Sequence, residues 1–206
     1  MKPIVGIVLL AAGMARRMGS DRNHKLLAEF DGVPLVRRSA FTAVDSDAAS
    51  VTVVVGHRQN DIRRALAGLP VAIVANPDYA TGIASSLRVG IAALEANDVD
   101  GALVMLADMP GVTAAVLNRL IAAFRNADGL SVIRAVARGK NGNPVILPRS
   151  LYAAIYQLEG DVGARHLIQS SGLSVIDVEI GDAAEMDIDT PEAVRAAGGI
   201  PEDDLG

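Results

Sequence analysis

The chain has 206 residues, 50% of them hydrophobic and only 3% aromatic, with a formal net charge of −5. This length favours one domain that buries roughly 70% of its unfolded surface, and a core poor in aromatic residues favours a parallel sheet covered by helices. The absence of cysteine excludes disulfides and thiolate sites. The sequence shows no signal-peptide pattern, no apolar run long enough for a membrane span and no basic stripe, which predicts a cytoplasmic protein without membrane or nucleic-acid partners.

Short apolar runs alternate with helical patterns along the chain. Strands are predicted at Ile4–Leu10, Val51–Val55, Val71–Ala75, Gly101–Leu106, Ser131–Ala137, Pro144–Leu147 and Ser174–Glu179. Helices are predicted near Pro34–Asp45, Gln59–Ala67, Ile83–Ala96, Thr113–Arg125, Arg149–Ile155, Val162–Gln169 and Pro191–Ala196. The alternation favours a three-layer α/β/α fold with a mostly parallel sheet, as one domain over residues 1–197 with a flexible tail at 198–206. Pro34 and Pro191 are predicted as first helical residues, the second capped by Thr190.

The first predicted strand runs into a loop that contains Gly13 and Gly19 and the cations Arg16 and Arg17, with Lys25 a little further on. Glycine lets a ligand approach the backbone, and backbone N–H groups and fixed cations bind phosphate oxygens. Five residues separate the two glycines, which excludes the P-loop, and an alanine at the second glycine position excludes the dinucleotide fingerprint. The alternative is an ordinary strand–turn–helix corner with surface arginines.

Polar motifs follow each of the first four predicted strands. They are Gly13–Lys25, Gly56-His57, Asn76–Ser86 and Ala107–Pro110. In open α/β sheets, ligands bind beyond the carboxyl ends of the strands. The sequence therefore predicts that these motifs converge on one site.

Acidic residues occur at two places suited to metal binding. Asp108 follows an apolar strand and precedes a proline turn, which favours a ligand for the Mg²⁺ of a nucleotide, although capping of the helix near Thr113 is the alternative. Asp187 and Asp189 alternate in an extended segment, so they lie on the same side, as a metal ligand and its supporter do. Helix capping is the alternative for Asp189.

Further segments carry weaker signals. Hydroxyl groups in the first turn of the helix near Ile83 can bind a base, ribose or phosphate, with N-capping as the alternative. The loop Gly139–Asn143 permits close backbone contact or is a plain turn, and the segment Gly160–Arg165 presents an arginine to an anion. The three histidines are dispersed along the chain, which favours structural roles.

Together the motifs resemble the molybdenum cofactor nucleotidyltransferases, and among them the cytidylyltransferase branch, from about Val5 to Val194. The motifs that carry the resemblance are LAAGMARRMG (Leu10–Gly19), KLL (Lys25–Leu27), NPDYATGIASSLRVG (Asn76–Gly90), LADMP (Leu106–Pro110), GNPVILP (Gly142–Pro148), GDVGAR (Gly160–Arg165) and DIDTPE (Asp187–Glu192). The resemblance implies a Rossmann-like nucleotidyltransferase fold of the nucleotide-diphospho-sugar transferase type. It also implies transfer of CMP from CTP to the terminal phosphate of a molybdopterin-type cofactor, with Mg²⁺ and release of pyrophosphate.

The resemblance assigns roles residue by residue. Catalytic roles fall to Lys25, Arg17 and Asp108, and metal binding to Asp108, Asp187 and Asp189. Nucleotide binding falls to Leu10, Ala11, Ala12, Gly13, Arg17, Lys25, Gly82, Ser86 and Asp108. Asn143 and Arg165 are expected to bind the pterin cofactor, and a recipient molybdoenzyme is a further expected partner. Lys25 lies three residues later than the family spacing, which leaves Arg22 as an alternative, and Ala15 stands where a serine is common.

Other functions remain open at this point. Ala12-Gly13 in place of two glycines, and His24-Lys25-Leu26 in place of Asp-Lys-Gly, favour CTP, with guanylyl transfer from GTP as the alternative. A non-catalytic carrier of the mature cofactor would keep the groove but tolerate loss of the acids. A sugar-nucleotide pyrophosphorylase is expected to carry an added acceptor or acyltransferase domain.

Overall fold

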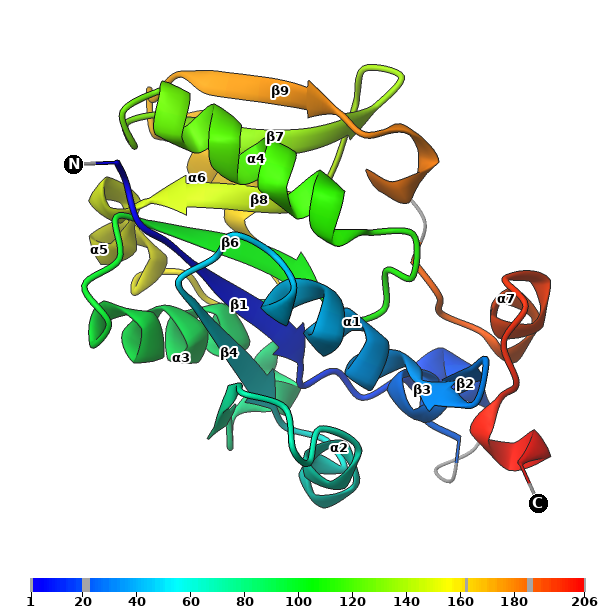
Figure 1. Ribbon diagram of the computed structural model, residues 1–206. Coiled ribbons are helices and arrows are strands. Elements are labelled where there is room, and N and C mark those ends of the chain that lie inside the picture. Colours follow the sequence, from blue (N-terminus) through cyan, green and yellow to red (C-terminus); the bar gives the residue numbers. More distant parts are fainter. Residues whose placement is uncertain (1, 20–22, 162, 185–186, 206) are drawn as a thin grey trace.

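The computed structural model describes residues 2–19, 23–161, 163–184 and 187–205. Within these ranges, seven strands form one sheet in the order β5-β4-β1-β6-β8-β7-β9 (Figure 1). Their bounds are Ala72–Ala75 (β5), Ser50–Val55 (β4), Val5–Ala11 (β1), Gly101–Leu106 (β6), Lys140–Pro148 (β8), Val132–Ala137 (β7) and Val175–Glu179 (β9). Strands β5, β4, β1 and β6 run parallel to one another, as do β7 and β9, whereas β8 runs antiparallel to both of its neighbours. The predicted mostly parallel sheet is confirmed.

Helices cover both faces of this sheet. The helices of the described ranges are α1 (Leu35–Val44), α2 (Gln59–Ala65), α3 (Ile83–Glu95), α4 (Ala114–Asn126), α5 (Tyr152–Ile155), α6 (Ala164–Ser170) and α7 (Pro191–Ala196). Of these, α7 lies away from the sheet, near the C-terminus (Figure 1). Successive side chains of β1 point to opposite faces, so Ile7 and Leu9 join the core beneath α1 and α4, while Val8 joins the core beneath α3, α5 and α6 (Figure 1). These layers confirm the three-layer α/β/α prediction.

Helices α4 and α7 each follow a threonine whose side chain accepts a hydrogen bond from a free N–H group of the first turn. Thr113 caps α4 by accepting a hydrogen bond from the Val116 N–H at 3.3 Å. Thr190 caps α7 in the same way, with Pro191 as its first residue, as predicted. Helix α1, in contrast, begins at Leu35, so Pro34 precedes it rather than opening it.

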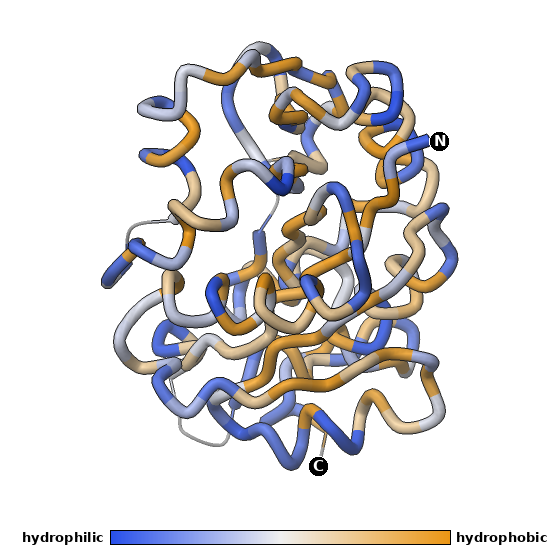
Figure 2. Tube along the Cα trace, turned by 90° about the vertical axis from the view of Figure 1, so that its left-hand side faces the viewer, coloured by the Kyte–Doolittle hydropathy of each residue, from blue (hydrophilic) through white to orange (hydrophobic). Residues whose placement is uncertain are grey.

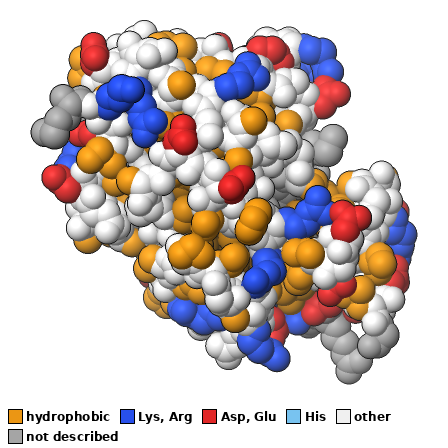
Figure 3. All heavy atoms as spheres, in the orientation of Figure 1, with side chains coloured by type: hydrophobic (Ala, Val, Ile, Leu, Met, Phe, Trp, Pro, Cys, Tyr) orange, Lys and Arg blue, Asp and Glu red, His pale blue; other side chains and the backbone are white. Residues whose placement is uncertain are grey.

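The hydropathy of the chain follows this arrangement. Hydrophobic stretches of the trace alternate with hydrophilic turns (Figure 2). On the face shown in Figure 3, Lys and Arg side chains lie among Asp and Glu side chains rather than in one basic stripe. In the described ranges, no helix combines the length and apolar character that a membrane span requires.

The main difference from the sequence prediction concerns residues 139–148. The sequence predicts a loop at Gly139–Asn143 and a strand at Pro144–Leu147, whereas the structure has one strand, β8, from Lys140 to Pro148. Arg138 and Gly139 form a tight turn with φ of 49° and 77°, and such turns join antiparallel strands. Because a parallel pair needs a long crossover, this turn forces β8 to reverse direction.

A small hairpin that the sequence did not predict lies beyond the sheet. Strands β2 (Glu29–Phe30) and β3 (Val33–Pro34) pair through an Asp31-Gly32 turn with φ of 54° and 74°. The last residues of the chain, expected as a flexible tail, return to this hairpin. Glu29 and Ile200 exchange backbone hydrogen bonds of 2.9 and 2.8 Å, and the segment lies beside the hairpin in Figure 1.

Candidate functional site

A cavity of about 420 Å³ opens at the carboxyl edge of the sheet. Strands β1, β4 and β6 end together there, since Leu10 is level with Val54 on one side and Leu106 on the other. The loops that follow these strands therefore meet, as predicted. The predicted site residues that line the cavity are Leu10, Ala12, Gly13, Arg17, Lys25, Gly82, Ser86, Asp108 and Asp189.

An ion-pair cluster lies on the wall of this cavity. The Lys25 side chain comes from a 3₁₀ turn that follows the loop of residues 13–19, here called the glycine loop. Its ammonium lies 2.5 Å from Asp108 Oδ2 and 2.6 Å from Asp189 Oδ1. Burial alone would lower the pKa of Lys25, but the two carboxylates outweigh it and the pKa lies above its usual value. Lys25 is therefore a permanent cation held between two acids from distant parts of the chain.

Asp189 carries a second ion pair. Arg17 Nη1 donates to Asp189 Oδ2 from the outer side of the cavity. Burial alone would raise the pKa of Asp189, but the hydrogen bond from Lys25 and the charges of Lys25 and Arg17 bring it below its ordinary value. Asp189 is therefore ionised across the physiological pH range.

The two acids fit a divalent cation. Asp108 Oδ1 is buried and has no hydrogen-bond partner in the described part of the chain. Mg²⁺ is commonly bound by one or two carboxylates together with substrate phosphates, which is what Asp108 and Asp189 offer. No group of three metal-ligating side chains lies within the described ranges, so the substrate would have to complete the coordination.

The third predicted metal ligand lies apart from this pair. The Ile188 N–H donates to the Asp108 carbonyl at 3.0 Å, which holds the segment of Asp187 and Asp189 alongside the end of β6. Asp189 turns into the cavity, whereas Asp187 is exposed and does not line it. A metal role for Asp187 stays a prediction.

Ser86 is held in place from the neighbouring strand. The Asn76 side-chain amide donates to Ser85 Oγ at 2.8 Å and to Ser86 Oγ at 2.9 Å, and all three side chains are buried. Because the Ser86 oxygen accepts from Asn76, its own proton is left to donate into the cavity. Asn76 is thus a supporting residue that sequence reasoning did not single out.

Ala11 differs from its neighbours. It is 1% exposed and packs in the core beneath α1 and α4, because successive side chains of β1 alternate and those of Leu10 and Ala12 take the cavity side. Other lining residues were not predicted as site residues. They are Met14, Ala15, Leu26, Tyr79, Ala80, Ile83, Leu106 and Asp161. Arg16, expected as a phosphate-binding cation, also lines the cavity.

A second cavity of about 250 Å³ adjoins the first, and Leu10, Ile83 and Leu106 line both. The predicted cofactor residues Asn143 and Arg165 line this second cavity, the former from β8 rather than from a loop. Its remaining wall is mainly apolar, apart from Arg134, Asn141 and glycine backbone. It could therefore take a flat, partly apolar molecule that carries anionic or amide groups.

His24, predicted to be structural, joins the glycine loop to the Lys25 turn. Its ring is 1% exposed, with Nε2 3.1 Å from the Gly13 carbonyl oxygen and Nδ1 accepting from the Leu26 N–H at 3.3 Å. Burial, above all, lowers the pKa of His24 to about 4. The imidazole is therefore neutral at physiological pH, with Nε2 as the donor to Gly13.

This neutral histidine predicts a pH-dependent stability. The unfolded pKa is 6.5 and the folded one about 4, so the unfolded chain binds more protons between these values. The contribution of His24 is complete above pH 6.5 and is lost as the pH falls towards 4, by about 3 kcal/mol. Urea unfolding from pH 7 to pH 4 measures this loss. A His24→Asn variant should show a flatter dependence, and an equally steep one would contradict the assignment.

Substitution by alanine is expected to have different effects at two glycines that line the cavity. At Gly82, where φ is 119°, an added Cβ would lie 2.3 Å from the Gly160 carbonyl, so Gly82→Ala should lower stability by about 2 kcal/mol. At Gly13 an added Cβ meets open space, so Gly13→Ala should keep its stability and instead weaken nucleotide binding. Thermal unfolding of both variants checks this, and equal midpoints would contradict it.

The sequence of this chain matches one family model and several known proteins. A family model described as "MobA-like NTP transferase domain" matches residues 7–175. The chain is 30% identical to nicotine blue oxidoreductase of Paenarthrobacter nicotinovorans, over 92% of this chain and 94% of that protein. It is also 30% identical to the purine catabolism protein PucB of Bacillus subtilis, over 90% and 91% of the two chains.

Solved structures share the fold. The crystal structure of Rv0371c from Mycobacterium tuberculosis superimposes with a TM-score of 0.81 at 22% identity, over 95% of this chain and 97% of that one. A second structure of Rv0371c, with a TM-score of 0.76, is a complex with manganese. At such identities the likeness establishes the α/β fold.

Proposed function

Because this chain belongs to the family of the MobA-like NTP transferase domain, we propose that it transfers CMP from CTP to the terminal phosphate of a molybdopterin-type cofactor. The observation that carries the proposal is the meeting of the glycine loop, Lys25, Asp108 and Asp189 around one cavity. Backbone N–H groups and a cation beside two carboxylates suit a nucleoside triphosphate and its divalent cation.

The reaction is a phosphoryl substitution. A terminal phosphate oxygen of the acceptor bonds to the α-phosphorus of CTP, the bond from that phosphorus to the bridging oxygen breaks, and pyrophosphate leaves with the electron pair. A phosphate monoester has a second pKa of about 6, so the nucleophile is largely dianionic near neutrality. It needs no strong general base, which agrees with a cavity wall of lysine, arginine and carboxylates.

The residues contribute by position and charge. Lys25 and Arg17 would neutralise the phosphate oxygens as charge shifts onto the leaving pyrophosphate. Asp108 and Asp189 would hold Mg²⁺, which when bound neutralises and orients the triphosphate. Ser86, held by Asn76, would donate a hydrogen bond to the base or ribose.

The second cavity supports an extended acceptor. The apolar wall of this cavity suits the face of a heterocycle. Asn143 and Arg165 offer an amide and a cation to polar groups at the edge of that heterocycle. Since the two cavities share Leu10, Ile83 and Leu106, an acceptor bound in one can extend its phosphate into the other.

The test is a nucleotide-selective assay of pyrophosphate release. The purified protein is incubated with a molybdopterin-type cofactor, Mg²⁺ or Mn²⁺, and either CTP or GTP. We expect release that depends on the acceptor and is at least tenfold faster with CTP. Faster release with GTP would make the protein a guanylyltransferase. No release from either nucleotide, with tight binding of the finished dinucleotide cofactor, would make it a carrier and contradict the proposal.

A further inference from the structure

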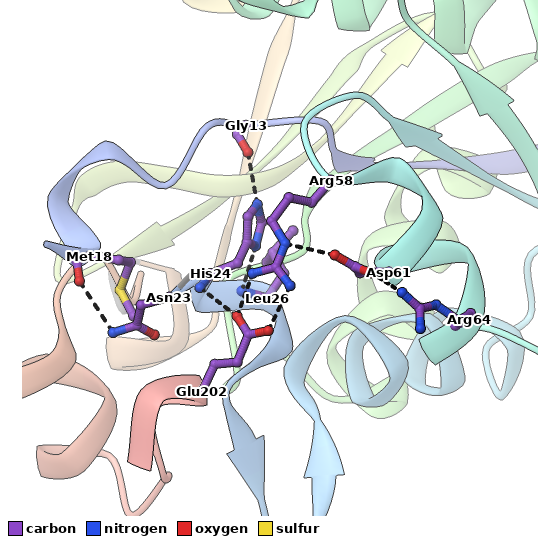
Figure 4. A network of polar contacts seen from close by, with 9 residues as sticks. All are labelled: Gly13, Met18, Asn23, His24, Leu26, Arg58, Asp61, Arg64 and Glu202. Atoms are coloured by element: carbon purple, nitrogen blue, oxygen red, sulfur yellow. Dashed lines mark hydrogen bonds and ion pairs between the residues drawn. The ribbon is translucent and has the colours of Figure 1, made fainter. Parts of the chain in front are cut away.

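We propose that the C-terminal segment 199–205, here called the strap, positions the nucleotide site through Glu202 and His24. In this arrangement Glu202 accepts a hydrogen bond from the backbone of His24, and the His24 ring contacts the Gly13 carbonyl (Figure 4). His24 thereby sets the spacing between the glycine loop and Lys25. Both are positioning residues, since they act through the loop and Lys25 rather than on substrate. The inference rests on the proposed nucleotidyl transfer.

The first step is the anchoring of Glu202. Arg58 donates to both of its carboxylate oxygens, at 2.7 Å each, and the His24 backbone N–H donates to Oε2 at 2.9 Å. The side chains of Glu202 and Arg58 are 23% and 22% exposed, so this bidentate pair is largely removed from water. Such pairs are stronger and more directional than exposed ones. The strap is therefore tied directly to the residue before Lys25.

The second step is the reach of the His24 ring. One ring nitrogen faces the Gly13 carbonyl at 3.1 Å and the other accepts from the Leu26 N–H, so the ring spans the gap between the loop and the turn that carries Lys25. The ring also stacks on His57, with 5.5 Å between centroids. The backbone N–H of His57 donates to the Ala12 carbonyl at 3.2 Å.

The third step is the backbone of Arg58. This residue has φ of 49°, a left-handed conformation that residues other than glycine rarely adopt. The same residue is the N-cap of α2 and also binds Asp61 through Nε at 2.7 Å (Figure 4). An uncommon backbone conformation in a residue whose side chain also pairs with Asp61 and Glu202 is typical of a functional constraint.

These contacts fix the position of the glycine loop relative to Lys25, and therefore the position in which a triphosphate would be bound. The loop N–H groups and the Lys25 ammonium must act on the same triphosphate, and a displacement of about 1 Å costs on the order of 10²-fold in rate. The strap, through Glu202, fixes the backbone of His24 from the side opposite the loop. Loosening Glu202 is therefore expected to weaken nucleotide binding without touching the cavity wall.

The experiment compares Glu202→Ala with Asp204→Asn. Asp204 lies on the same strap and pairs with Arg195, but it is not part of the network around His24. In folded protein, Glu202→Ala should raise the KM for CTP at least tenfold, whereas Asp204→Asn should stay within twofold. Glu202→Gln should be intermediate, because its amide oxygen can still accept from the His24 N–H. A KM for Glu202→Ala equal to that of the wild type, with only a lower unfolding temperature, would overturn the proposal.

A double-mutant cycle adds a readout that a merely structural role would not move. If Glu202 acts through His24, the pair Glu202→Ala and His24→Asn should raise KM by less than the product of the two single effects. Additive effects would overturn the proposal. Calorimetric titration with CTP and Mg²⁺ keeps the test separate from catalysis. A wild type that binds CTP but transfers nothing refutes the proposed function alone, and tenfold weaker binding by Glu202→Ala would still support the strap.

Discussion

Replacing Lys25 by methionine is expected to lower turnover by about 10²- to 10³-fold and, at the same time, to strengthen the binding of Mn²⁺ in the absence of nucleotide. The ammonium lies within 2.6 Å of both Asp108 and Asp189, so a divalent cation has to compete with it for the same two carboxylates. Methionine keeps the unbranched stem without the charge. The two effects therefore separate the role of Lys25 towards phosphate from its contact with the acids.

Steady-state kinetics and electron paramagnetic resonance of free Mn²⁺ measure the two effects. Arg17→Met is the matched control, because among the described residues Arg17 pairs with Asp189 but not with Asp108, and its side chain is 73% exposed. It should lower turnover by about tenfold and change metal affinity little. Unchanged Mn²⁺ affinity in Lys25→Met would show that the cation does not use the Asp108–Asp189 pair.

The sequence predicted the part of the site that depends on strand order. The apolar run at the start of the chain has no exposed face, which is typical of a central parallel strand, and β1 is flanked by β4 and β6. Once that strand is central, the loops after it and its neighbours must meet at one edge. This is why Gly13 and Asp108 share a cavity although they lie far apart in the sequence.

The direction of β8 depends on a tight turn at Arg138-Gly139, whose residue types do not by themselves distinguish a hairpin from a longer loop. Arg138-Gly139 has the positive φ values of a two-residue hairpin turn. The sequence predicts a loop over Gly139–Asn143, either in contact with a ligand or as a plain turn, whereas residues 140–143 belong to β8. Asp31-Gly32 is the same kind of signal for the β2–β3 hairpin.

The strap shows why other features could not be predicted. Its run of acidic residues has the composition of a frayed end, and Glu202 lies 178 positions after its partner His24. The partner Arg58 is brought near by the packing of α2. Contacts between residues this far apart in the sequence cannot be predicted from the composition of either segment. Alternation along the chain does not distinguish Asp187 from Asp189, whereas in the structure Asp189 lines the cavity and Asp187 is exposed. The partners of Asp189, Arg17 and Lys25, come from a distant part of the sequence.

Changing Asp108 to asparagine is expected to reduce turnover by about 10³-fold while the protein stays folded. The side-chain volume is unchanged, but a neutral amide replaces the carboxylate, so the metal loses its charged ligand at the end of β6 and Lys25 keeps Asp189 as its remaining acidic partner. Turnover measured against Mg²⁺ concentration should also require far more metal for half-maximal rate. Circular dichroism checks the fold, and near-normal activity would remove the metal role of Asp108.

The matched pair Asp187→Asn and Asp189→Asn then decides which acid completes the site. Asp189 contacts Lys25 and lines the cavity, whereas Asp187 is exposed, so the loss of turnover should be much larger for Asp189→Asn. The Mg²⁺ concentration needed for half-maximal rate should also rise more in Asp189→Asn than in Asp187→Asn. If Asp187→Asn instead lost as much activity and needed as much extra Mg²⁺, the cation would bind further out along this segment, and Lys25 would be free to remain on Asp189 while the nucleotide reacts.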